Sequence, residues 1–152
     1  MKIKRILVPV DFSRYSLKAL DDAADLAAPF GAELVAVFVI EPIYYAMPDF
    51  VGAGGSVGSV VEEQRQSAER ELAKLRERQE RRGRRLRTLV RSGAPHEGIV
   101  DAAAAVKASL IVMATHGRTG LTHVLMGSVA ERVVRSAPCP VLTIKPRRPS
   151  RE

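Results

Sequence analysis

One passage of the chain goes from a buried strand to a helix through a glycine-containing loop, and it constrains the fold most. The apolar run 108–113 has the length of an interior strand, and from about Leu121 to Arg135 apolar residues recur at helical spacing. Gly117 and Gly120 lie between them. Glycine lets backbone N–H groups approach an anion, and a helix N-terminus attracts negative charge. We therefore predict a phosphate-binding loop here, with an ordinary tight turn as the alternative.

The rest of the chain alternates strand-like and helix-like segments. Such alternation builds a mostly parallel sheet covered on both faces. We predict an α/β fold in one domain, with a doubly wound, five-stranded parallel sheet and helices on both faces. The expected strands span 6–10, 33–40, 85–91, 108–113 and 141–144; the expected helices begin after the capping residue Ser13, near Glu62, at Pro95 and near Leu121.

Length and composition fit one compact domain. The chain has 152 residues, of which 46% are hydrophobic, and we assign residues 1–146 to the domain. Residues 147–152 are polar and broken by proline, so we expect a disordered tail. No run approaches the roughly 18 apolar residues of a membrane span, and the first residues lead into a strand and not a secretory signal. We expect a cytoplasmic protein without a membrane partner.

The positive charge is concentrated in one segment. Residues 65–91 hold eleven arginines and lysines against four acids, and the remainder of the chain holds thirteen of each, so this segment supplies the whole net charge of +7. It has no interleaved aromatic residue for base stacking, and its glutamates are mixed among the basic residues. We favour a solvated helix face over nucleic acid binding, which stays as the weaker alternative.

A long glycine-rich stretch, residues 42–58, separates the second strand from the charged helix and has no regular period. Loops of this length inside compact domains are often functional. It is either a flexible flap near the ligand site or a surface excursion without a role.

The glycine spacing resembles the signature of the universal stress protein family, in which glycines and a Gly-Ser or Gly-Thr pair surround the phosphates of ATP. Gly117, nine intervening residues and then Gly127 and Ser128 match that spacing, whereas Ala114 stands where the family has its first glycine. Residues 5–13 and 136–144 extend the resemblance over nearly the whole chain. It implies a Rossmann-like, adenine-nucleotide-binding fold, with ATP, with or without Mg²⁺, as cofactor and a role in the stress response.

In a doubly wound sheet, ligands bind beyond the carboxyl ends of the strands. The resemblance implies that Asp11 hydrogen-bonds the adenine or ribose region and that Val39 contacts adenine. It also implies that backbone N–H groups and the Ser128 hydroxyl bind the phosphates, the N–H groups being those of Gly117, Gly127, Ser128 and Val129. Asp11 has a structural alternative as a carboxylate at a helix N-terminus, and Ser128 as a small residue packed within a helix. The candidate site residues are Pro9, Val10, Asp11, Val39, Met113, Ala114, His116, Gly117, Arg118, Gly120, Gly127, Ser128 and Val129.

Two of these residues carry charge or a titratable ring close to the expected phosphates. Arg118 adds a positive charge beside the loop. His116 either contacts a phosphate or shuttles a proton, or packs against the turn.

An enzymatic function has less support. The chain lacks the lysine-containing P-loop of NTPases, and we assign neither catalytic residues nor a metal-ligand set. Slow ATP hydrolysis or self-phosphorylation is left open. We carry two hypotheses: an ATP-binding regulatory protein of the universal stress type, and a nucleotide-independent dimeric interaction module with a vestigial glycine loop.

The last strand predicts an oligomer. Val141 to Ile144 is short, rich in β-forming residues and late in the chain, and a late strand often lies at the edge of a sheet, where unpaired backbone groups invite a second copy. The family resemblance implies the same pairing. We therefore expect a homodimer joined through this strand. The alternative is a monomer whose edge is guarded by Pro140 and by the charged tail that begins at Lys145.

Overall fold

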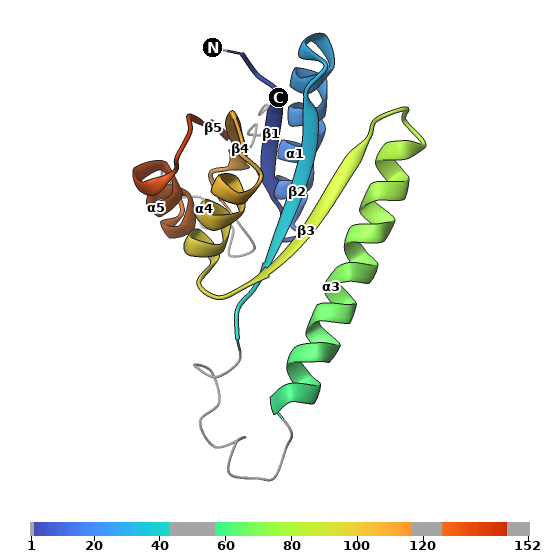
Figure 1. Cartoon of the computed structure of the whole chain (residues 1–152), viewed down its shortest axis with the longest axis vertical. Coiled ribbons are helices and arrows are strands. Elements are labelled where there is room, and N and C mark those ends of the chain that lie inside the picture. Colours follow the sequence, from blue (N-terminus) through green and yellow to red (C-terminus); the bar gives the residue numbers. More distant parts are fainter. Residues whose placement is uncertain (1, 43–56, 117–125, 146–152) are drawn as a thin grey trace, which may run out of the picture.

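A computed structural model of the chain describes residues 2–42, 57–116 and 126–145, which form one parallel sheet flanked by helices (Figure 1). The elements in chain order are β1 (Arg5–Pro9), α1 (Arg14–Ala27), the 3-10 helix η1 (Ala28–Phe30), β2 (Glu33–Ile40), α3 (Val57–Glu80), β3 (Leu86–Ser92), α4 (Pro95–Ala105), β4 (Leu110–Ala114), α5 (Ser128–Ser136) and β5 (Val141–Ile144).

The strands are ordered β3-β2-β1-β4-β5, and every neighbouring pair is parallel. Ile6 of β1 is in register with Leu34 of β2 on one side and with Leu110 of β4 on the other. The strand order therefore reverses between β1 and β4, and β5 lies at an edge. This topology confirms the predicted doubly wound, five-stranded parallel sheet.

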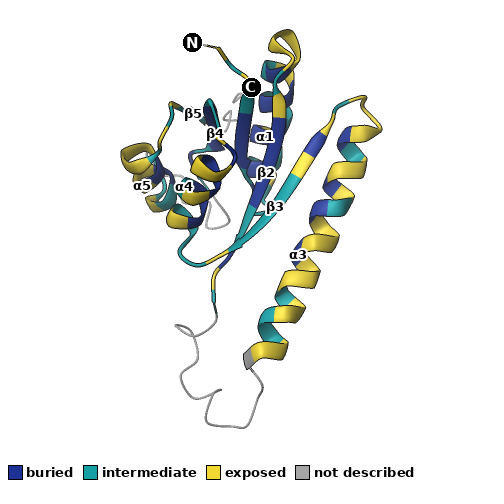
Figure 2. Ribbon diagram, viewed as in Figure 1, coloured by how far each residue is buried: buried dark blue, intermediate teal, exposed yellow. Residues whose placement is uncertain are grey.

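Helices cover both faces of the sheet. On one face, α1 and α3 pack against Ile6 and Val8; on the other, α4 and α5 pack against Leu7 and Ile111. Burial on both faces explains why the central strands are almost continuously apolar. Figure 2 shows these strands in the colour of buried residues, whereas much of α3 is exposed.

Local signals in the sequence set several helix ends. The Ser13 side chain accepts a hydrogen bond from the Ser16 N–H group (3.2 Å) and caps α1, as predicted. After α3, the chain turns at Gly83, whose φ of +73° lies in the left-handed region that favours glycine.

Other boundaries differ from the prediction. The charged helix begins at Val57 and not near Glu62, and β4 spans Leu110–Ala114 and not 108–113. The described part of the last helix begins at Ser128, because Gly127 is extended (φ −71°, ψ 154°), and the predicted start near Leu121 lies outside the described residues. Apolar spacing alone does not detect such a change of backbone direction. Residues 121–125, the segment 43–56 and the tail from residue 146 lie outside the described residues.

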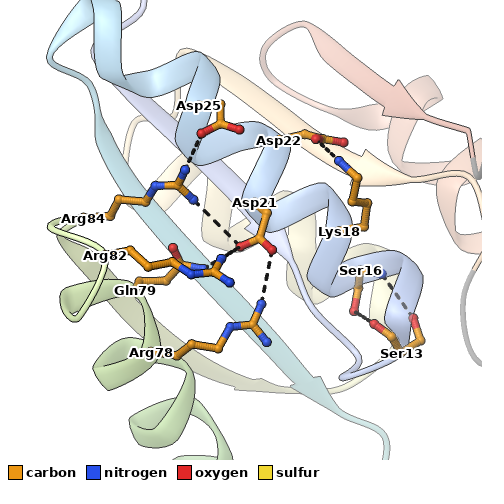
Figure 3. A network of polar contacts seen from close by, with 10 residues as sticks. All are labelled: Ser13, Ser16, Lys18, Asp21, Asp22, Asp25, Arg78, Gln79, Arg82 and Arg84. Carbon is orange, nitrogen blue, oxygen red and sulfur yellow. Dashed lines mark hydrogen bonds and ion pairs between the residues drawn. The ribbon is translucent and has the colours of Figure 1, made fainter.

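The carboxy-terminal end of the charged helix forms a contact that the sequence did not predict. Asp21 of α1 accepts hydrogen bonds from Gln79 (2.8 Å), Arg82 (3.0 Å) and Arg78 (3.2 Å), and Arg84 pairs with Asp25 one turn further along α1 (Figure 3). Part of the basic segment is therefore engaged in holding α3 against α1.

This pairing alters the ionisation of Asp21. Burial raises the pKa of Asp21, but the hydrogen bond from Gln79 and the charges of Arg78 and Arg82 outweigh burial and hold the pKa below its usual value. Asp21 is thus ionised throughout the neutral pH range.

Candidate functional site

A cleft of about 670 Å³ opens at the carboxyl ends of β1, β2 and β4. Its wall is formed by the loop between β1 and α1, the last residues of β2 and the end of β4. Helices α3 and α4 and the first turn of α5 complete it. This volume lies within the range of about 300–1,000 Å³ that is typical of small-molecule sites. The cleft also lies beside the reversal of strand order, where doubly wound sheets bind their ligands.

Most of the predicted site residues meet in this cleft, although they come from distant parts of the sequence. Gly117, Arg118 and Gly120 lie outside the described residues. The others all line the cleft: Pro9, Val10, Asp11, Val39, Met113, Ala114, His116, Gly127, Ser128 and Val129.

Gly127 brings the start of α5 against the end of β4. Its N–H group donates a hydrogen bond to the Thr115 carbonyl oxygen (2.7 Å), and a Cβ atom at residue 127 would lie 3.0 Å from that oxygen. Glycine therefore allows close approach of two backbone segments here and is not needed for a positive φ. The Gly127 N–H group is already engaged, which differs from the expectation that it donates to a phosphate.

The first turn of α5 offers further N–H donors beside the cleft. Ser128, Val129 and Ala130 begin α5, and the N–H groups of a first turn have no acceptor within their own helix. The helix dipole adds partial positive charge at the same place. All three residues line the cleft, so its α5 end is suited to an anionic group.

The loop after β1 holds Asp11 at the cleft. The Asp11 side chain accepts a hydrogen bond from the Ser13 N–H group (3.0 Å), while the Asp11 N–H group donates to the Ser16 hydroxyl (3.2 Å). Phe12 has a φ of 61°, which is uncommon for a bulky residue. The centroid of its ring lies 5.0 Å from the centroid of the Phe38 ring. Asp11 thus has a structural part in the turn and also lines the cleft.

His116 lies just after β4 and lines the cleft, whereas its contact with a phosphate or a role in proton transfer stays a prediction. Its Nδ1 atom is 2.8 Å from the hydroxyl of Thr115, a side chain that is only 2% exposed. The Thr115 N–H group in turn donates to the Ile144 carbonyl oxygen of β5 (3.1 Å). The ring therefore packs against the turn, and it also lines the cleft.

The sequence did not predict the contribution of α3. Its cleft-lining residues are Gln64, Ser67, Ala68 and Glu71. They are spaced at i, i+3, i+4 and i+7, so they share one face of the helix. That spacing is visible in the sequence, but nothing local in it indicates which sheet edge the face meets.

A close contact beneath Val39 positions the end of β2. A Cβ atom added to Gly98 of α4 would lie 2.8 and 2.9 Å from the two methyl groups of Val39. Helix α4 therefore packs directly under a cleft-lining residue.

Two further observations concern the described residues 2–42, 57–116 and 126–145. Within them, no cluster of three His, Cys, Asp or Glu residues could hold a metal ion. No helix among them is both long and apolar enough to cross a membrane.

Comparison with known protein families identifies the architecture. Residues 2–145 match the Universal stress protein family. The chain belongs to this family. It is 40% identical over 144 residues to the universal stress protein MJ0531 of Methanocaldococcus jannaschii, an alignment that covers 93% of this chain and 82% of the relative.

Solved structures of family members share the fold. Protein MJ0577 of Methanocaldococcus jannaschii superposes with a TM-score of 0.82 at 26% identity, covering 98% of this chain and all (100%) of that one. The universal stress protein from Archaeoglobus fulgidus that was solved in complex with dAMP superposes with a TM-score of 0.65 at 24% identity, covering 95% of this chain and 100% of that one. At that identity, the second likeness is one of fold alone.

Proposed function

We propose that this protein binds ATP in the cleft and acts in the cytoplasm as a nucleotide-dependent regulator of the stress response, not as a dedicated catalyst. One observation carries the proposal: the first turn of α5, whose N–H groups have no acceptor within the helix, lines a cleft of nucleotide size at the reversal of strand order. Membership of the universal stress protein family supports it.

The cleft offers a partner for each part of ATP. The N–H groups of Ser128, Val129 and Ala130 would hold the phosphates, and the apolar end of β2 at Val39 would contact the adenine ring. The carboxylate of Asp11 would accept a hydrogen bond from the nucleoside. A Mg²⁺ ion would arrive with the nucleotide, bound to phosphate oxygens.

The sequence is consistent with a regulatory role. It contains no P-loop, whose lysine and hydroxyl group support phosphoryl transfer in many NTPases. Under the proposal, occupation of the cleft alters the shape of the protein or its partner binding.

A proline at residue 128 tests the site with little disturbance of the fold. Ser128 is the first residue of α5, where proline is well tolerated, and Gly127 before it has the extended backbone that a following proline requires. S128P removes one N–H donor and the hydroxyl group, whereas the matched control S128A removes the hydroxyl group alone.

We expect S128P to weaken ATP binding about tenfold or more in isothermal titration calorimetry, since a hydrogen bond to a charged group contributes about 1.5–3 kcal/mol. S128A retains the N–H group and should bind more tightly than S128P. Equal binding by S128P and the parent would refute this phosphate site. A parent that binds no adenine nucleotide would favour the nucleotide-independent module.

We also propose a homodimer joined through β5. The strand lies at the edge of the sheet, and two large apolar side chains on this side of the molecule are exposed, Leu142 on β5 (42%) and Val134 on α5 (46%). An edge strand beside exposed apolar side chains is a natural surface for pairing with a second copy.

Hydrogen bonds to β4 indicate which residues of β5 face outward. The carbonyl group of Pro140, just before β5, accepts from the N–H group of Ile111, and that of Ile144 accepts from Thr115, just after β4. Backbone groups alternate along a strand, so those of Val141 and Thr143 point to the free edge. A dimer that pairs through this edge needs the Thr143 N–H group.

We expect T143P to shift the dimer to monomer in sedimentation equilibrium, because proline is compatible with an edge strand but cannot donate to a partner strand. T143V keeps the N–H group and should remain dimeric. A parent that stays monomeric at tens of micromolar, roughly where an interface of modest affinity associates, would refute the dimer.

A further inference from the structure

Gln64 on α3 has an unused hydrogen-bonding group at the cleft. Its side chain lines the cleft, and its Oε1 atom is shielded from solvent and has no hydrogen-bond partner among the described residues. A buried polar atom without a partner is costly and is uncommon in native proteins. Its presence at a binding cleft indicates that a ligand supplies the partner.

Gln64 shares the cleft with the apolar end of β2. Figure 1 shows the first turns of α3 at the end of the sheet where β2 stops. Val39 and Ile40 at the end of β2 line the same cleft as Gln64. A planar ring that contacts the apolar end of β2 needs hydrogen-bonding partners for the polar atoms on its edge. Helix α3 lines the same cleft and can supply one of them.

The chemistry of a carboxamide selects a particular ring edge. A glutamine side chain offers one acceptor and one NH₂ donor side by side. Adenine offers the complementary pair, an exocyclic N6 amine that donates and an adjacent ring nitrogen that accepts, and amide side chains recognise it in this bidentate manner.

We propose that Gln64 is a specificity-determining residue that recognises the adenine base through its N6 amine and an adjacent ring nitrogen. The inference rests on the proposed binding of ATP in the cleft. It adds a base contact from α3, separate from the phosphate contacts at α5.

Gln66 supplies a matched control on the same helix. It is exposed, and its amide donates to Glu62 (3.1 Å) one turn earlier on the helix surface. The variants Q64L and Q66L make the same chemical change at the cleft and at the outer surface. Circular dichroism and thermal melting check that both variants remain folded.

The test is a comparison of ATP with purine riboside triphosphate, which lacks only the N6 amine, by isothermal titration calorimetry. We expect the parent and Q66L to prefer ATP about five- to tenfold, the effect of one net hydrogen bond. In Q64L the ratio of the two affinities should fall close to one. 7-Deaza-ATP and 1-deaza-ATP, measured against the parent, then identify the ring nitrogen: the analogue that binds more weakly than ATP lacks the contacted atom.

Each other outcome contradicts the proposal. If Q64L keeps the preference of the parent, Gln64 does not recognise the base. If Q64L weakens both nucleotides equally, its partner is the ribose or a phosphate and not adenine. A parent that binds neither nucleotide overturns both this inference and the proposed function, whereas the first two results leave ATP binding intact.

Discussion

Replacing Asp21 by alanine tests how the basic segment contributes to stability. The Asp21 carboxylate accepts hydrogen bonds from Gln79, Arg78 and Arg82, which tie the end of α3 to α1 (Figure 3). Gln79 is fully buried (0% exposed), and its Oε1 atom has no hydrogen-bond partner among the described residues. D21A removes the partner of Arg78 and Arg82, and it also leaves the NH₂ group of Gln79 without its acceptor.

The expected loss of stability follows from these contacts. A buried donor without an acceptor costs about 1–3 kcal/mol, and each partly exposed ion pair contributes about 0.2–1 kcal/mol. The Asp21 side chain is 26% exposed, so the ion pairs are screened by solvent only in part. We expect D21A to lower the free energy of unfolding by about 2–4 kcal/mol. For a chain of this length the melting temperature should fall by roughly 5–15 °C.

The neighbouring residue provides the control. Asp22 pairs with Lys18 along the surface of α1, and the Lys18 side chain is 64% exposed. D22A removes the same carboxylate group from the same helix and should cost about 0.5 kcal/mol or less. Urea unfolding monitored by circular dichroism gives both values. A loss for D21A no larger than that for D22A would refute the argument that the Asp21 contacts fix α3.

The contribution of Asp21 to stability depends on pH in a definite direction. The pKa of Asp21 in the folded protein is lowered from its usual value of 3.8. Its contribution to stability is therefore present above pH 3.8 and is lost as the pH falls through the folded pKa. We expect the difference in stability between the parent and D21N to shrink under acidic conditions below pH 3.8 and to stay constant near neutrality.

Three further predictions concern other parts of the molecule. G98A should destabilise the protein by about 1–3 kcal/mol and weaken ATP binding, because the new methyl group displaces Val39; unchanged melting and calorimetry would contradict this. Burial raises the pKa of the Cys139 thiol more than the hydrogen bond with the Ile111 backbone lowers it. Because only the thiolate reacts, Cys139 should react with a disulfide reagent at pH 7 more slowly than a small free thiol does. Equal rates would contradict this prediction. Duplex DNA binding should disappear near about 150 mM salt in a filter-binding assay, since diffuse phosphate contacts weaken steeply with salt; tight binding there would restore the nucleic acid hypothesis.

Local patterns in the sequence were sufficient for much of the fold. Strand β2 occupies the predicted range, and Ser13 caps α1 as predicted. Both depend on features that act over a few residues, the continuous apolar run of a strand buried on both faces and the hydroxyl group that pairs with an N–H group three residues later. The alternation of strands and helices then allows few topologies, so the doubly wound sheet was also predictable.

The start of α5 was not predictable from local periodicity. Leu121 and the apolar residues after it have helical spacing, yet the described part of the last helix begins only at Ser128. The deciding interaction is the hydrogen bond from the Gly127 N–H group to the carbonyl group of Thr115, which sits at the end of another element. A contact of this kind depends on how two segments approach each other in space.

The sequence by itself determined the class of fold, the family and ten of the residues that line the cleft, because glycine spacing and strand ends are properties of short segments. Only the tertiary structure decided that Gln64 joins the cleft and that Asp21 engages the arginines at the end of α3. The residues that meet are far apart in the sequence: Gln64 joins Asp11 at the cleft, and Asp21 contacts Gln79. No local preference specifies which helix face meets which sheet edge. Packing of the apolar stripe Ala68, Leu72 and Leu75 against the sheet sets the rotation of α3, and this rotation directs one polar group to the cleft and another to α1.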